Sequence, residues 1–383
     1  MNYPIKFRIG LDARSVADKM CGISRVTLGT IKSLSKIDQY NEYVIYVDTY
    51  KADLDKNLGH NFEIRPTNCN RMNFFRDRKF KLMMESDKLD LYHSFHSFLP
   101  FFITNTAKIF VTIHDLFALN DPRFFAKYGP LDKVAQMYFR RLIERSVERA
   151  DIIITVSEYC KKEIISNFPN SRDKIYVIYN ASDLAANRSR EIKLEKLAGK
   201  RYLLYVGNSR SYKNTEVLID GYHRYLIRKN SCEDVELVIA GNDSYRAIEH
   251  KAKRLGIDNN VIIFNNPTDD ELRSLYSNSL AFIMPSRWEG FGLPVVEGMS
   301  FGIPVITSDA DALVEIARGA SLVFKKDSPE ELATAIETLV DNKALRNMLV
   351  VKGFERAKDF TWERSAQRLQ ELYNSVLSKE SNK

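Results

Sequence analysis

The sequence predicts two α/β domains, each built on a parallel sheet that helices cover on both faces. Short β-branched runs alternate with longer stretches of helical period along most of the 383 residues. The strand-like runs are apolar on both faces, which is typical of parallel sheets with two covered sides. A polar, basic stretch at 184–201 interrupts the alternation once. A chain of this length is expected to hold two to three domains at about 150 residues each.

The first series of elements is expected to form a Rossmann-like, doubly wound domain over residues 1–182. Between its first two strands, the segment 22–37 places Ile23, Val26, Ile31 and Leu34 on one helical face. The strands of this series are expected at 5–11, 43–47, 89–93, 109–113, 151–156 and 175–179.

The second series restarts after the polar stretch and is expected to form another Rossmann-like domain over residues 183–360. The tail, 361–383, is expected to form a helix whose apolar side chains serve packing, namely Trp362, Ala366, Leu369, Leu372 and Leu377. The strands of the second series are expected at 202–206, 235–240, 261–264, 281–285 and 304–307.

Composition and charge exclude several classes of protein. The apolar fraction of 44% supplies a core and argues against disorder. The net charge of +7 comes from interspersed charges of both signs, and no nucleic-acid-binding motif appears, so nucleic acid is not expected as a partner. The four cysteines form no CxxC pair, which argues against a disulfide framework or a zinc site. No signal core or run of about 18 apolar residues is present, so a cytoplasmic location is expected.

The segment that follows the expected strand 281–285 predicts an anion site. Ligands bind at the carboxyl ends of strands in open parallel sheets. Here the sequence reads SRWEGFGLPVVE, in which Gly290 and Gly292 leave backbone N–H groups accessible and Pro294 suits the first turn of a helix. This loop, with Phe291 and Leu293, fits a diphosphate held at a helix N-terminus.

Two carboxylates flank the same loop. Glu289 stands just before it, and Glu297 falls about one turn inside the expected helix. A carboxylate beside an anion site does not hold the anion itself, but it suits hydroxyl donors such as a ribose diol or a sugar.

A second loop, GNSRSYKN, follows the expected strand 202–206 and begins at Gly207. Its Arg210 and Lys213 can neutralise a diphosphate, the arginine through its fork and the lysine as a point charge. Ordinary surface loops often carry such pairs, so the functional interpretation depends on the glutamate-flanked loop in the same domain.

The first domain offers weaker signals. His114 ends the strand 109–113, where a single histidine is as often structural as functional. Gly22 begins a helix whose N-terminus can face a phosphate, although the absence of GxGxxG argues against a dinucleotide fingerprint. Ser157 and Glu158 look like an ordinary helix N-cap with an acid in the first turn.

Taken together, these motifs resemble glycosyltransferase family 4, the retaining, nucleotide-sugar-dependent group with the GT-B fold. The resemblance covers nearly the whole chain and is most specific in 202–325. It rests on EGFGLPVVE at 289–297, GNSRSYKN at 207–214, TIHD at 112–115, TVSE at 155–158 and GIPV at 302–305.

The resemblance implies a role for each candidate residue. Glu297 would bind the ribose diol and Glu289 the donor sugar, while Arg210 and Lys213 would bind the diphosphate. His114 would lie near the donor sugar and its anomeric carbon. The loop around Gly22 resembles the family's glycine-rich phosphate loop, although Cys21 stands where a second glycine is common.

The resemblance also implies an architecture and an activity. Residues 1–182 would bind the acceptor and residues 183–360 the donor across a central cleft, with the helix of 361–383 returning to the first domain. The expected reaction moves a hexosyl group, with mannose from GDP-mannose as the first choice, onto a saccharide or lipid-linked saccharide of a cell-surface polysaccharide. Nothing in the motifs requires a metal or cofactor beyond the donor.

Two other functions remain open. A GT-B-fold epimerase would use the same diphosphate and ribose contacts but would turn over the donor alone. A non-catalytic nucleotide-sugar-binding protein would keep Glu297 and Arg210 without needing His114 or Glu289.

The segment 71–81, RMNFFRDRKFK, leaves a further alternative open. It holds five basic residues and three aromatic ones, Phe74, Phe75 and Phe80. This composition suits peripheral contact with an anionic membrane surface. It equally suits an ordinary helix that packs its phenylalanines inward.

Overall fold

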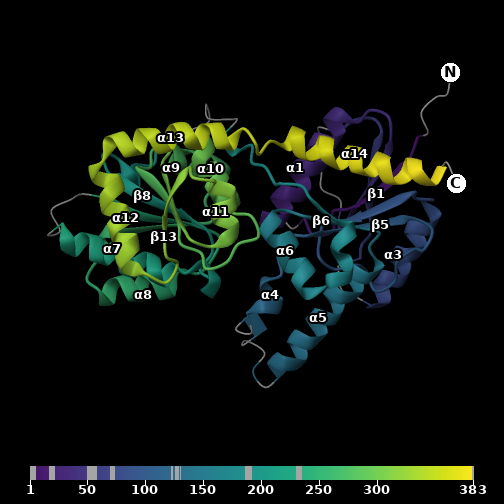
Figure 1. The fold of residues 1–383 in the computed structure, drawn as a ribbon, viewed down its shortest axis with the longest axis horizontal. Helices are drawn as coiled ribbons and strands as arrows, with labels where there is room; N and C mark the ends of the chain where they lie inside the picture. The colour runs from purple at the N-terminus through teal and green to yellow at the C-terminus, as the bar shows by residue number, and fades with distance from the viewer. Residues whose placement is uncertain are drawn as a thin grey trace. The chain divides into compact units, whose positions relative to one another are not determined.

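The chain folds into two compact units (Figure 1). The computed structural model describes residues 6–16, 22–49, 58–69, 74–121, 124–125, 129, 131–185, 192–229 and 235–381. Unit 1 comprises Met1–Ala181 and Trp362–Lys383, and unit 2 comprises Ser182–Thr361. The chain therefore passes from one unit to the other after Ala181 and again after Thr361.

Unit 1 contains a seven-stranded sheet in the order β3-β2-β1-β4-β5-β6-β7, and all its strand pairs are parallel. Its strands are β1 (Arg8–Asp12), β2 (Glu42–Val47), β3 (Phe62–Pro66), β4 (Leu91–Ser94), β5 (Lys108–Ile113), β6 (Ile152–Thr155) and β7 (Ile175–Val177). Its helices are α1 (Gly22–Ile37), α3 (Phe74–Ser86), α4 (Phe117–Asn120), α5 (Asp132–Arg149), α6 (Glu158–Asn167) and α14 (Trp362–Ser381), with a 3₁₀ turn at Pro169–Lys174.

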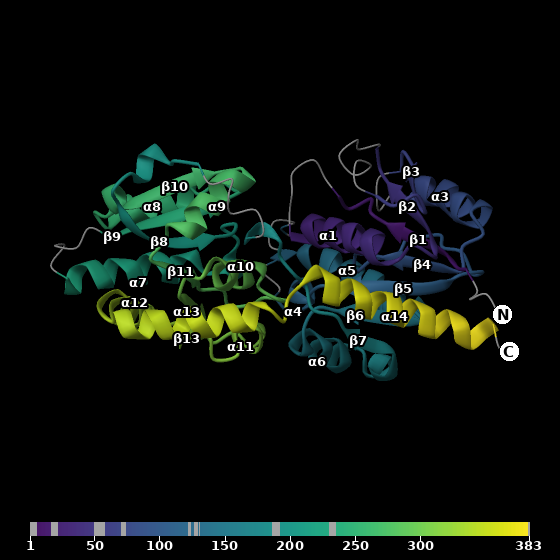
Figure 2. The ribbon, with the colours of Figure 1, turned by 90° about the horizontal axis from the view of Figure 1, so that it is seen from above.

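Helices cover both faces of this sheet because alternate strand residues are apolar on opposite sides. One core cluster joins Phe80 of α3 and Leu142 of α5 to the strands, and the other joins Ile31 of α1 and Tyr373 of α14. Helix α14 lies beside α1 in both views (Figures 1 and 2). A Cβ on Gly29 of α1 would come within 2.4 Å of the Trp362 ring, so the glycine permits this close packing.

Unit 2 contains a six-stranded parallel sheet in the order β10-β9-β8-β11-β12-β13. Its strands are β8 (Arg201–Val206), β9 (Val235–Gly241), β10 (Val261–Asn265), β11 (Ala281–Met284), β12 (Val305–Ser308) and β13 (Ser321–Phe324). Its helices are α7 (Thr215–Arg228), α8 (Arg246–Arg254), α9 (Asp269–Ser277), α10 (Leu293–Phe301), α11 (Asp311–Ala317), α12 (Pro329–Asp341) and α13 (Lys343–Ala357). Short 3₁₀ turns lie at Glu195–Leu197, Ser211–Lys213 and Asp258–Asn260.

Each sheet has one edge strand that sequence patterning did not predict, β3 in unit 1 and β13 in unit 2, whereas the other edge strands, β7 and β10, were predicted. β3 is only partly buried along its length, and three of the four residues of β13 are not fully buried. Both strands lie at a sheet edge, where one neighbour is missing and the side chains need not be apolar on both faces. An edge position weakens the two-sided apolar signal without always removing it, since the edge strands β7 and β10 were still predicted.

Candidate functional site

The candidate site of unit 2 lies where the order of its sheet reverses. β8 and β11 are neighbours at the centre, and the chain leaves β8 toward β9 but leaves β11 toward β12. In open parallel sheets, ligands bind beside the carboxyl ends of such a strand pair. The loops that begin at Gly207 and Pro285 follow these two strands. The structure thus brings together the two loops that the sequence singled out.

The loop after β8 is held in one conformation by tyrosine and aspartate side chains. The Tyr205 hydroxyl donates to the carbonyl of Asn208 at 2.6 Å, and a Cβ at position 207 would meet that hydroxyl at the same distance. Position 207 therefore favours glycine, because the Tyr205 hydroxyl lies too close for a Cβ atom. Asp243, in the turn after β9, accepts hydrogen bonds from the backbone N–H and the hydroxyl of Ser209 at 2.6 and 2.8 Å.

Asp243 is a site residue that the sequence analysis missed. Its partial burial alone would raise its pKa, but the hydrogen bonds from Ser209 and Ser244 and the nearby Arg210 outweigh this and lower the pKa of the carboxyl. The Arg210 side chain itself is exposed. Asp243 thus anchors the loop at Ser209 as a charged group, and Arg210, which follows Ser209, remains exposed. Its position just after the carboxyl end of β9 is the feature of the sequence that could have identified it.

The loop after β11 leads directly into helix α10. Gly292 caps α10 with a φ of +95°, a left-handed conformation that favours glycine, and a Cβ there would lie 2.7 Å from Leu313. Pro294 occupies the first turn. The Phe291 side chain is buried and packs edge-on against Phe360. Any contribution of Phe291 to anion binding would come through its backbone at the helix N-terminus.

Lys213 and Glu289 form an ion pair that links the two loops. The Lys213 Nζ and Glu289 Oε1 atoms are 2.7 Å apart, and their side chains are 12% and 10% exposed. A backbone hydrogen bond from Arg287 to the carbonyl of Tyr212, at 2.7 Å, joins the loops a second time. Sequence reasoning assigned Lys213 to a diphosphate and Glu289 to a sugar, without predicting their contact. The two predicted site residues are therefore in direct contact.

Glu297 lies on the inner side of α10 and is 8% exposed. Its Oε2 accepts a hydrogen bond from the Tyr276 hydroxyl of α9 at 2.8 Å, and its Oε1 accepts one from Ser182 at 3.3 Å. These bonds rule out a solvated glutamate at this position. They fix the carboxylate one turn inside a helix whose N-terminus carries a partial positive charge. Tyr276 and Ser182 were not predicted as partners, because neither lies in a recognisable motif.

In unit 1, His114 lies at the carboxyl end of β5 and is 9% exposed. Its Nε2 is 3.0 Å from the carbonyl oxygen of Phe95, which can only accept, so Nε2 carries the proton of this bond. The carbonyl fixes the orientation of the ring. Gly22 begins α1, but residues 17–21, including Cys21, lie outside the described part of the chain. Ser157 caps α6 by accepting from the backbone of Cys160, which confirms its structural interpretation.

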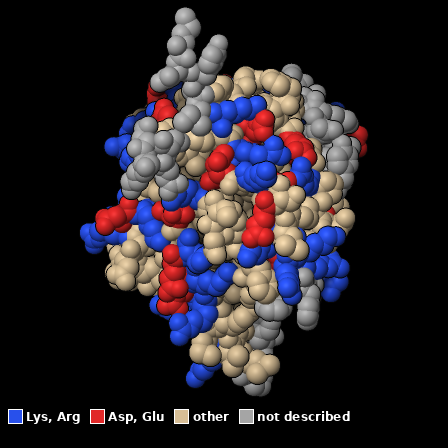
Figure 3. All heavy atoms as spheres, turned by 90° about the vertical axis from the view of Figure 1, so that its right-hand side faces the viewer, with Lys and Arg blue, Asp and Glu red and all other residues tan. Residues whose placement is uncertain are grey.

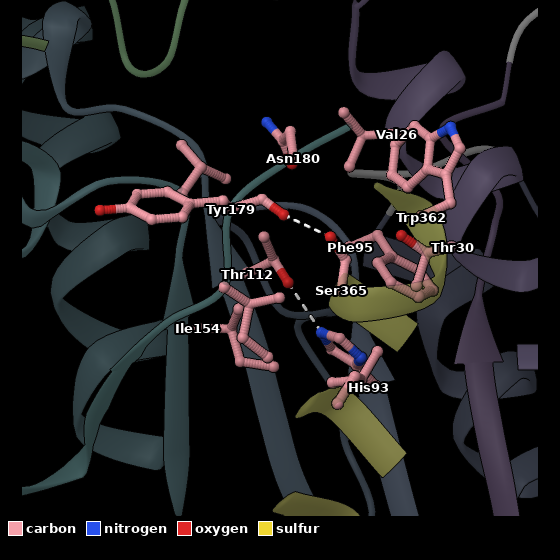
Figure 4. A pocket seen from close by; sticks show the side chains of 13 residues that line it. Val26, Thr30, His93, Phe95, Thr112, Ile154, Tyr179, Asn180, Trp362 and Ser365 are labelled. Carbon is pink, nitrogen blue, oxygen red and sulfur yellow. Dashed lines mark hydrogen bonds between the residues drawn. The ribbon is translucent and has the colours of Figure 1, made fainter. Parts of the chain in front are cut away.

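A small cavity of about 30 Å³ lies beside His93 of β4 (Figure 4). His93 shares hydrogen bonds with Thr112 at 2.7 Å and Tyr373 at 2.5 Å, and Ser365 donates to the carbonyl of Tyr179 at 2.6 Å. Burial, with the nearby His114, lowers the pKa of His93 to about 3. A space of this size holds about one water molecule and is too small for a sugar.

The reversal point of the unit 1 sheet, between β1 and β4, is filled by a buried ion pair. Arg14 bonds both carboxylate oxygens of Asp12 at 2.9 Å, and its side chain is 1% exposed. Tyr92 donates to the same carboxylate at 2.6 Å, and the guanidinium lies 3.7 Å above the Phe80 ring centroid. The interpretation of Phe80 as a membrane-facing aromatic is therefore wrong, because its ring is fully buried in the core. The side chains of Phe74 and Phe75 lie outside the described residues.

Membrane-spanning helices and clustered metal ligands are both absent from the described part of the chain. No described helix is both long and apolar enough to cross a membrane. Within the same residues, no group of three or more His, Cys, Asp or Glu side chains could hold a metal ion.

Two family models match consecutive parts of the chain. Residues 20–186 match the model described as Glycosyltransferase Family 4, and residues 187–356 match the model described as Glycosyl transferases group 1. Together they span 20–356.

Individual relatives are 25–29% identical to this chain. O-antigen chain mannosyltransferase B of Escherichia coli is 25% identical over 370 residues, which covers 90% of this chain and 93% of that protein. O-antigen chain mannosyltransferase RfbU of Salmonella typhimurium is 29% identical over 232 residues, 60% of each chain. The structure of Anabaena Alr3699/HepE in complex with UDP-glucose has a TM-score of 0.71 at 15% identity, covering 96% of this chain and all of that one. This last likeness shows the fold.

Proposed function

The chain belongs to glycosyltransferase family 4, and on that premise we propose that it transfers a hexosyl group from a nucleoside diphosphate sugar to an acceptor hydroxyl with retention at the anomeric carbon. The observation that carries the proposal is the meeting of Arg210, the Lys213–Glu289 pair and the N-terminus of α10 at the carboxyl ends of β8 and β11. Cationic groups lie there beside a carboxylate that can accept hydrogen bonds from hydroxyl groups. A donor substrate that carries both a diphosphate and a sugar requires this combination.

Stabilising the leaving diphosphate is the main catalytic demand of this reaction. Preorganised cations and helix N-termini meet it electrostatically, because they need no rearrangement as charge develops. Arg210 is exposed and can offer its guanidinium fork to phosphate oxygens. Lys213 bonds Glu289, and an ammonium group has three N–H donors, so it can bind a carboxylate and a phosphate oxygen at the same time. We therefore assign the diphosphate to protein groups, without a metal, and expect turnover to persist in the presence of a chelator.

The two glutamates take different parts of the donor in this proposal. Tyr276 fixes the Glu297 carboxylate inside α10, and a carboxylate held in this way can accept hydrogen bonds from a ribose diol. Glu289 contacts Lys213, so it stands at the boundary between the diphosphate and the transferred sugar. On the family resemblance, His114 positions that sugar and polarises its hydroxyls, while a donor phosphate oxygen accepts the proton of the acceptor.

The proposed donor is GDP-mannose, ahead of UDP-hexoses and dTDP-rhamnose, and the proposed acceptor is a saccharide or lipid-linked saccharide. The support for mannose and for cell-surface polysaccharide synthesis comes from the two relatives named as O-antigen chain mannosyltransferases. The same proposal places the enzyme in the cytoplasm, where nucleotide sugars are made.

The test is a panel of nucleotide sugars, measured by calorimetry and by turnover with a saccharide acceptor. One donor should bind more tightly than its nucleoside diphosphate and yield a product whose anomeric configuration, read by NMR, matches that of the donor. Lys213→Ala should abolish most turnover. Lys200→Ala is the matched control, because Lys200 forms an ion pair of 3.1 Å with Glu236 away from these loops.

Three outcomes would contradict the proposal. Inversion of the anomeric carbon would exclude the retaining mechanism, and conversion of a donor without any acceptor would indicate an epimerase. Tight binding of a nucleotide sugar with no turnover across a broad acceptor panel would favour a binding protein.

His114 is tested separately. His114→Ala should lower kcat far more than it weakens binding of the nucleoside diphosphate, with the exposed His250→Ala as control. Unchanged turnover would return His114 to a structural role.

A further inference from the structure

A polar pocket of about 260 Å³ lies at the amino-terminal edge of the sheet of unit 1. Arg8, Glu42 and Phe62, which begin β1, β2 and β3, line it together with Lys6. Because the strands of this sheet are parallel, the pocket lies at the edge opposite to the carboxyl end of β5, where His114 is found. A strand of five residues such as β1 spans about 16 Å between the two edges. The pocket is therefore distinct from the candidate site residue of unit 1.

Charges of opposite sign alternate along the wall of this pocket. Lys6 Nζ lies 2.8 Å from Glu42 Oε1, and Arg8 Nη1 lies 2.7 Å from Glu42 Oε2. Arg8 Nη2 also lies 3.5 Å from Glu63 Oε2. The hydrogen bonds from Lys6 and Arg8 lower the pKa of the Glu42 carboxyl, which therefore carries a negative charge at neutral pH. Two cations and two carboxylates of the wall thus compensate each other, and Figure 3 shows Lys and Arg side chains among Asp and Glu side chains over one face of unit 1.

Hydrogen bonds and ring stacking hold other parts of the wall in place. Asn61 Nδ2 donates to the carbonyls of Asp38 and Asn41 at 3.0 and 2.6 Å, which fixes the Asn61 carboxamide. The half-buried Phe62 ring stacks on Tyr43, with ring centroids 4.2 Å apart and an angle of 11° between the planes. Binding of a ligand therefore requires little ordering of these side chains, which lowers its cost in conformational entropy.

The chemistry of the wall favours a neutral ligand that is rich in hydroxyl groups. An anion would lie against Glu42 and Glu63 and a cation against Lys6 and Arg8, so a ligand of either charge would meet like charges. A hydroxyl group both donates and accepts, so it can donate to a carboxylate while it accepts from a neighbouring cation. Phe62 supplies an apolar surface for the C–H groups of a sugar ring. The pocket volume is several times the roughly 30 Å³ that one water molecule occupies in the liquid, which leaves room for a sugar residue.

We propose that this pocket at the amino-terminal ends of β1, β2 and β3 binds a neutral saccharide. A saccharide bound there lies at the edge of the sheet away from His114, so it is held without taking part in a transfer reaction. The inference goes beyond the proposed sugar transfer, and the binding is measured without a nucleotide sugar. Its failure would therefore leave the transferase proposal untouched.

The experiment titrates the full chain with mannose, glucose and galactose, followed by saturation-transfer NMR and calorimetry. At least one of these neutral hexoses should bind. Its 6-phosphate and its 2-amino derivative should each bind at least fivefold more weakly, because each adds a charge that meets like charges in the wall. These two derivatives keep the ring and change only the charge and one substituent.

Glu63→Gln is the first test of where the hexose binds. It should weaken hexose binding about tenfold, because a charged acceptor for hydroxyl groups is lost. It should also tighten binding of the hexose 6-phosphate relative to the hexose, since the wall then carries a net positive charge. Arg65, the second partner of Glu63, keeps its ion pair with Asp87, so the variant is expected to fold.

Two further variants serve as controls. Glu85→Gln removes an ion pair of 3.5 Å with Lys81 on α3, outside the pocket, and should leave hexose binding unchanged. His114→Ala should also leave it unchanged, because His114 lies at the opposite edge of the sheet.

The proposal is overturned if none of the three hexoses binds, or if Glu63→Gln and Glu85→Gln bind the hexose equally well. It is also overturned if His114→Ala abolishes binding that Glu63→Gln preserves, because the saccharide would then occupy the candidate active site. Tighter binding of a charged derivative than of the hexose would indicate an ion site instead. Thermal unfolding confirms that each variant folds. Should Glu63→Gln unfold, Gln39→Ala/His60→Ala decides the question, because both side chains line the pocket and are exposed, and their loss should weaken hexose binding about threefold or more.

Discussion

The two units share a strand order around their centres but treat the point where that order reverses in different ways. In unit 1, the side chain of Arg14 folds back onto Asp12 beside the ends of β1 and β4, and both are buried. In unit 2, glycines at 207 and 292 let the loops after β8 and β11 pass close to the side chains of Tyr205 and Leu313, and Arg210 is exposed. The topology therefore places two adjacent strand ends at the reversal point of both sheets. In unit 1, the side chains that follow the strands close this position as part of the core, whereas in unit 2 they leave a cation exposed.

The largest expected effect on stability comes from removing the buried ion pair at the reversal point of the unit 1 sheet. Arg14→Ala should destabilise unit 1 by about 3–5 kcal/mol, because it leaves the Asp12 carboxylate buried without its cation. The two tryptophans lie one in each unit, so a Trp288→Phe background leaves Trp362 fluorescence to report denaturant unfolding of unit 1. Arg8→Ala, which removes a half-exposed pair with Glu42, is the control. Equal stability of the two variants would contradict the comparison.

Arg210, the exposed cation of unit 2, should matter for catalysis and not for stability, the opposite of Arg14. Arg210→Ala should change the free energy of unfolding by less than about 0.5 kcal/mol, since the side chain is exposed. It should lower kcat/KM roughly 100-fold, equivalent to about 2.7 kcal/mol of transition-state stabilisation. Stability and steady-state kinetics are measured on the same preparation. A variant that is unstable but normally active would mean that Arg210 serves the fold as Arg14 does.

The two glutamates sharpen the comparison within unit 2. Glu297→Gln should weaken nucleoside diphosphate and intact donor about equally, by roughly 1.5–3 kcal/mol, because a charged acceptor for the diol is lost. Glu289→Gln should preserve affinity for the nucleoside diphosphate, since it releases Lys213 from its ion pair, but should impair donor binding or turnover. Calorimetry with both ligands on both variants gives four affinities. Equal losses in all four would refute this division of roles.

Low pH should lower the free energy of unfolding of unit 1 more than that of unit 2, by a smaller amount than the substitutions above. His93 is fully buried with its pKa lowered to about 3, whereas no histidine is buried in the portion of unit 2 that the structure describes. The unfolded chain takes up a proton near pH 6.5 but native His93 does not, so this contribution is complete above pH 6.5 and is lost as the pH falls toward 3. At pH 5 the loss is about 2 kcal/mol. His93→Gln should weaken the pH dependence of the unfolding of unit 1, followed by Trp362 fluorescence. An unchanged pH dependence would show that His93 is not its cause.

The sequence by itself determined the class of fold, the inner strands and the two loops of the candidate site. Local pattern carries this information because an inner parallel strand is apolar on both faces and a ligand loop at its carboxyl end needs glycines and charges. The edge strands β3 and β13 were not predicted, although the edge strands β7 and β10 were, so an edge position weakens the apolar signal without always removing it. Tertiary structure alone decided the contact of Lys213 with Glu289, 76 residues apart, and the hydrogen bond of Tyr276 to Glu297. It also decided that Phe80 faces Arg14 and the core while Val134 and Met137 remain exposed. The physical reason is that which elements become neighbours depends on the order of strands in a sheet, and the periodicity of a single segment does not record that order.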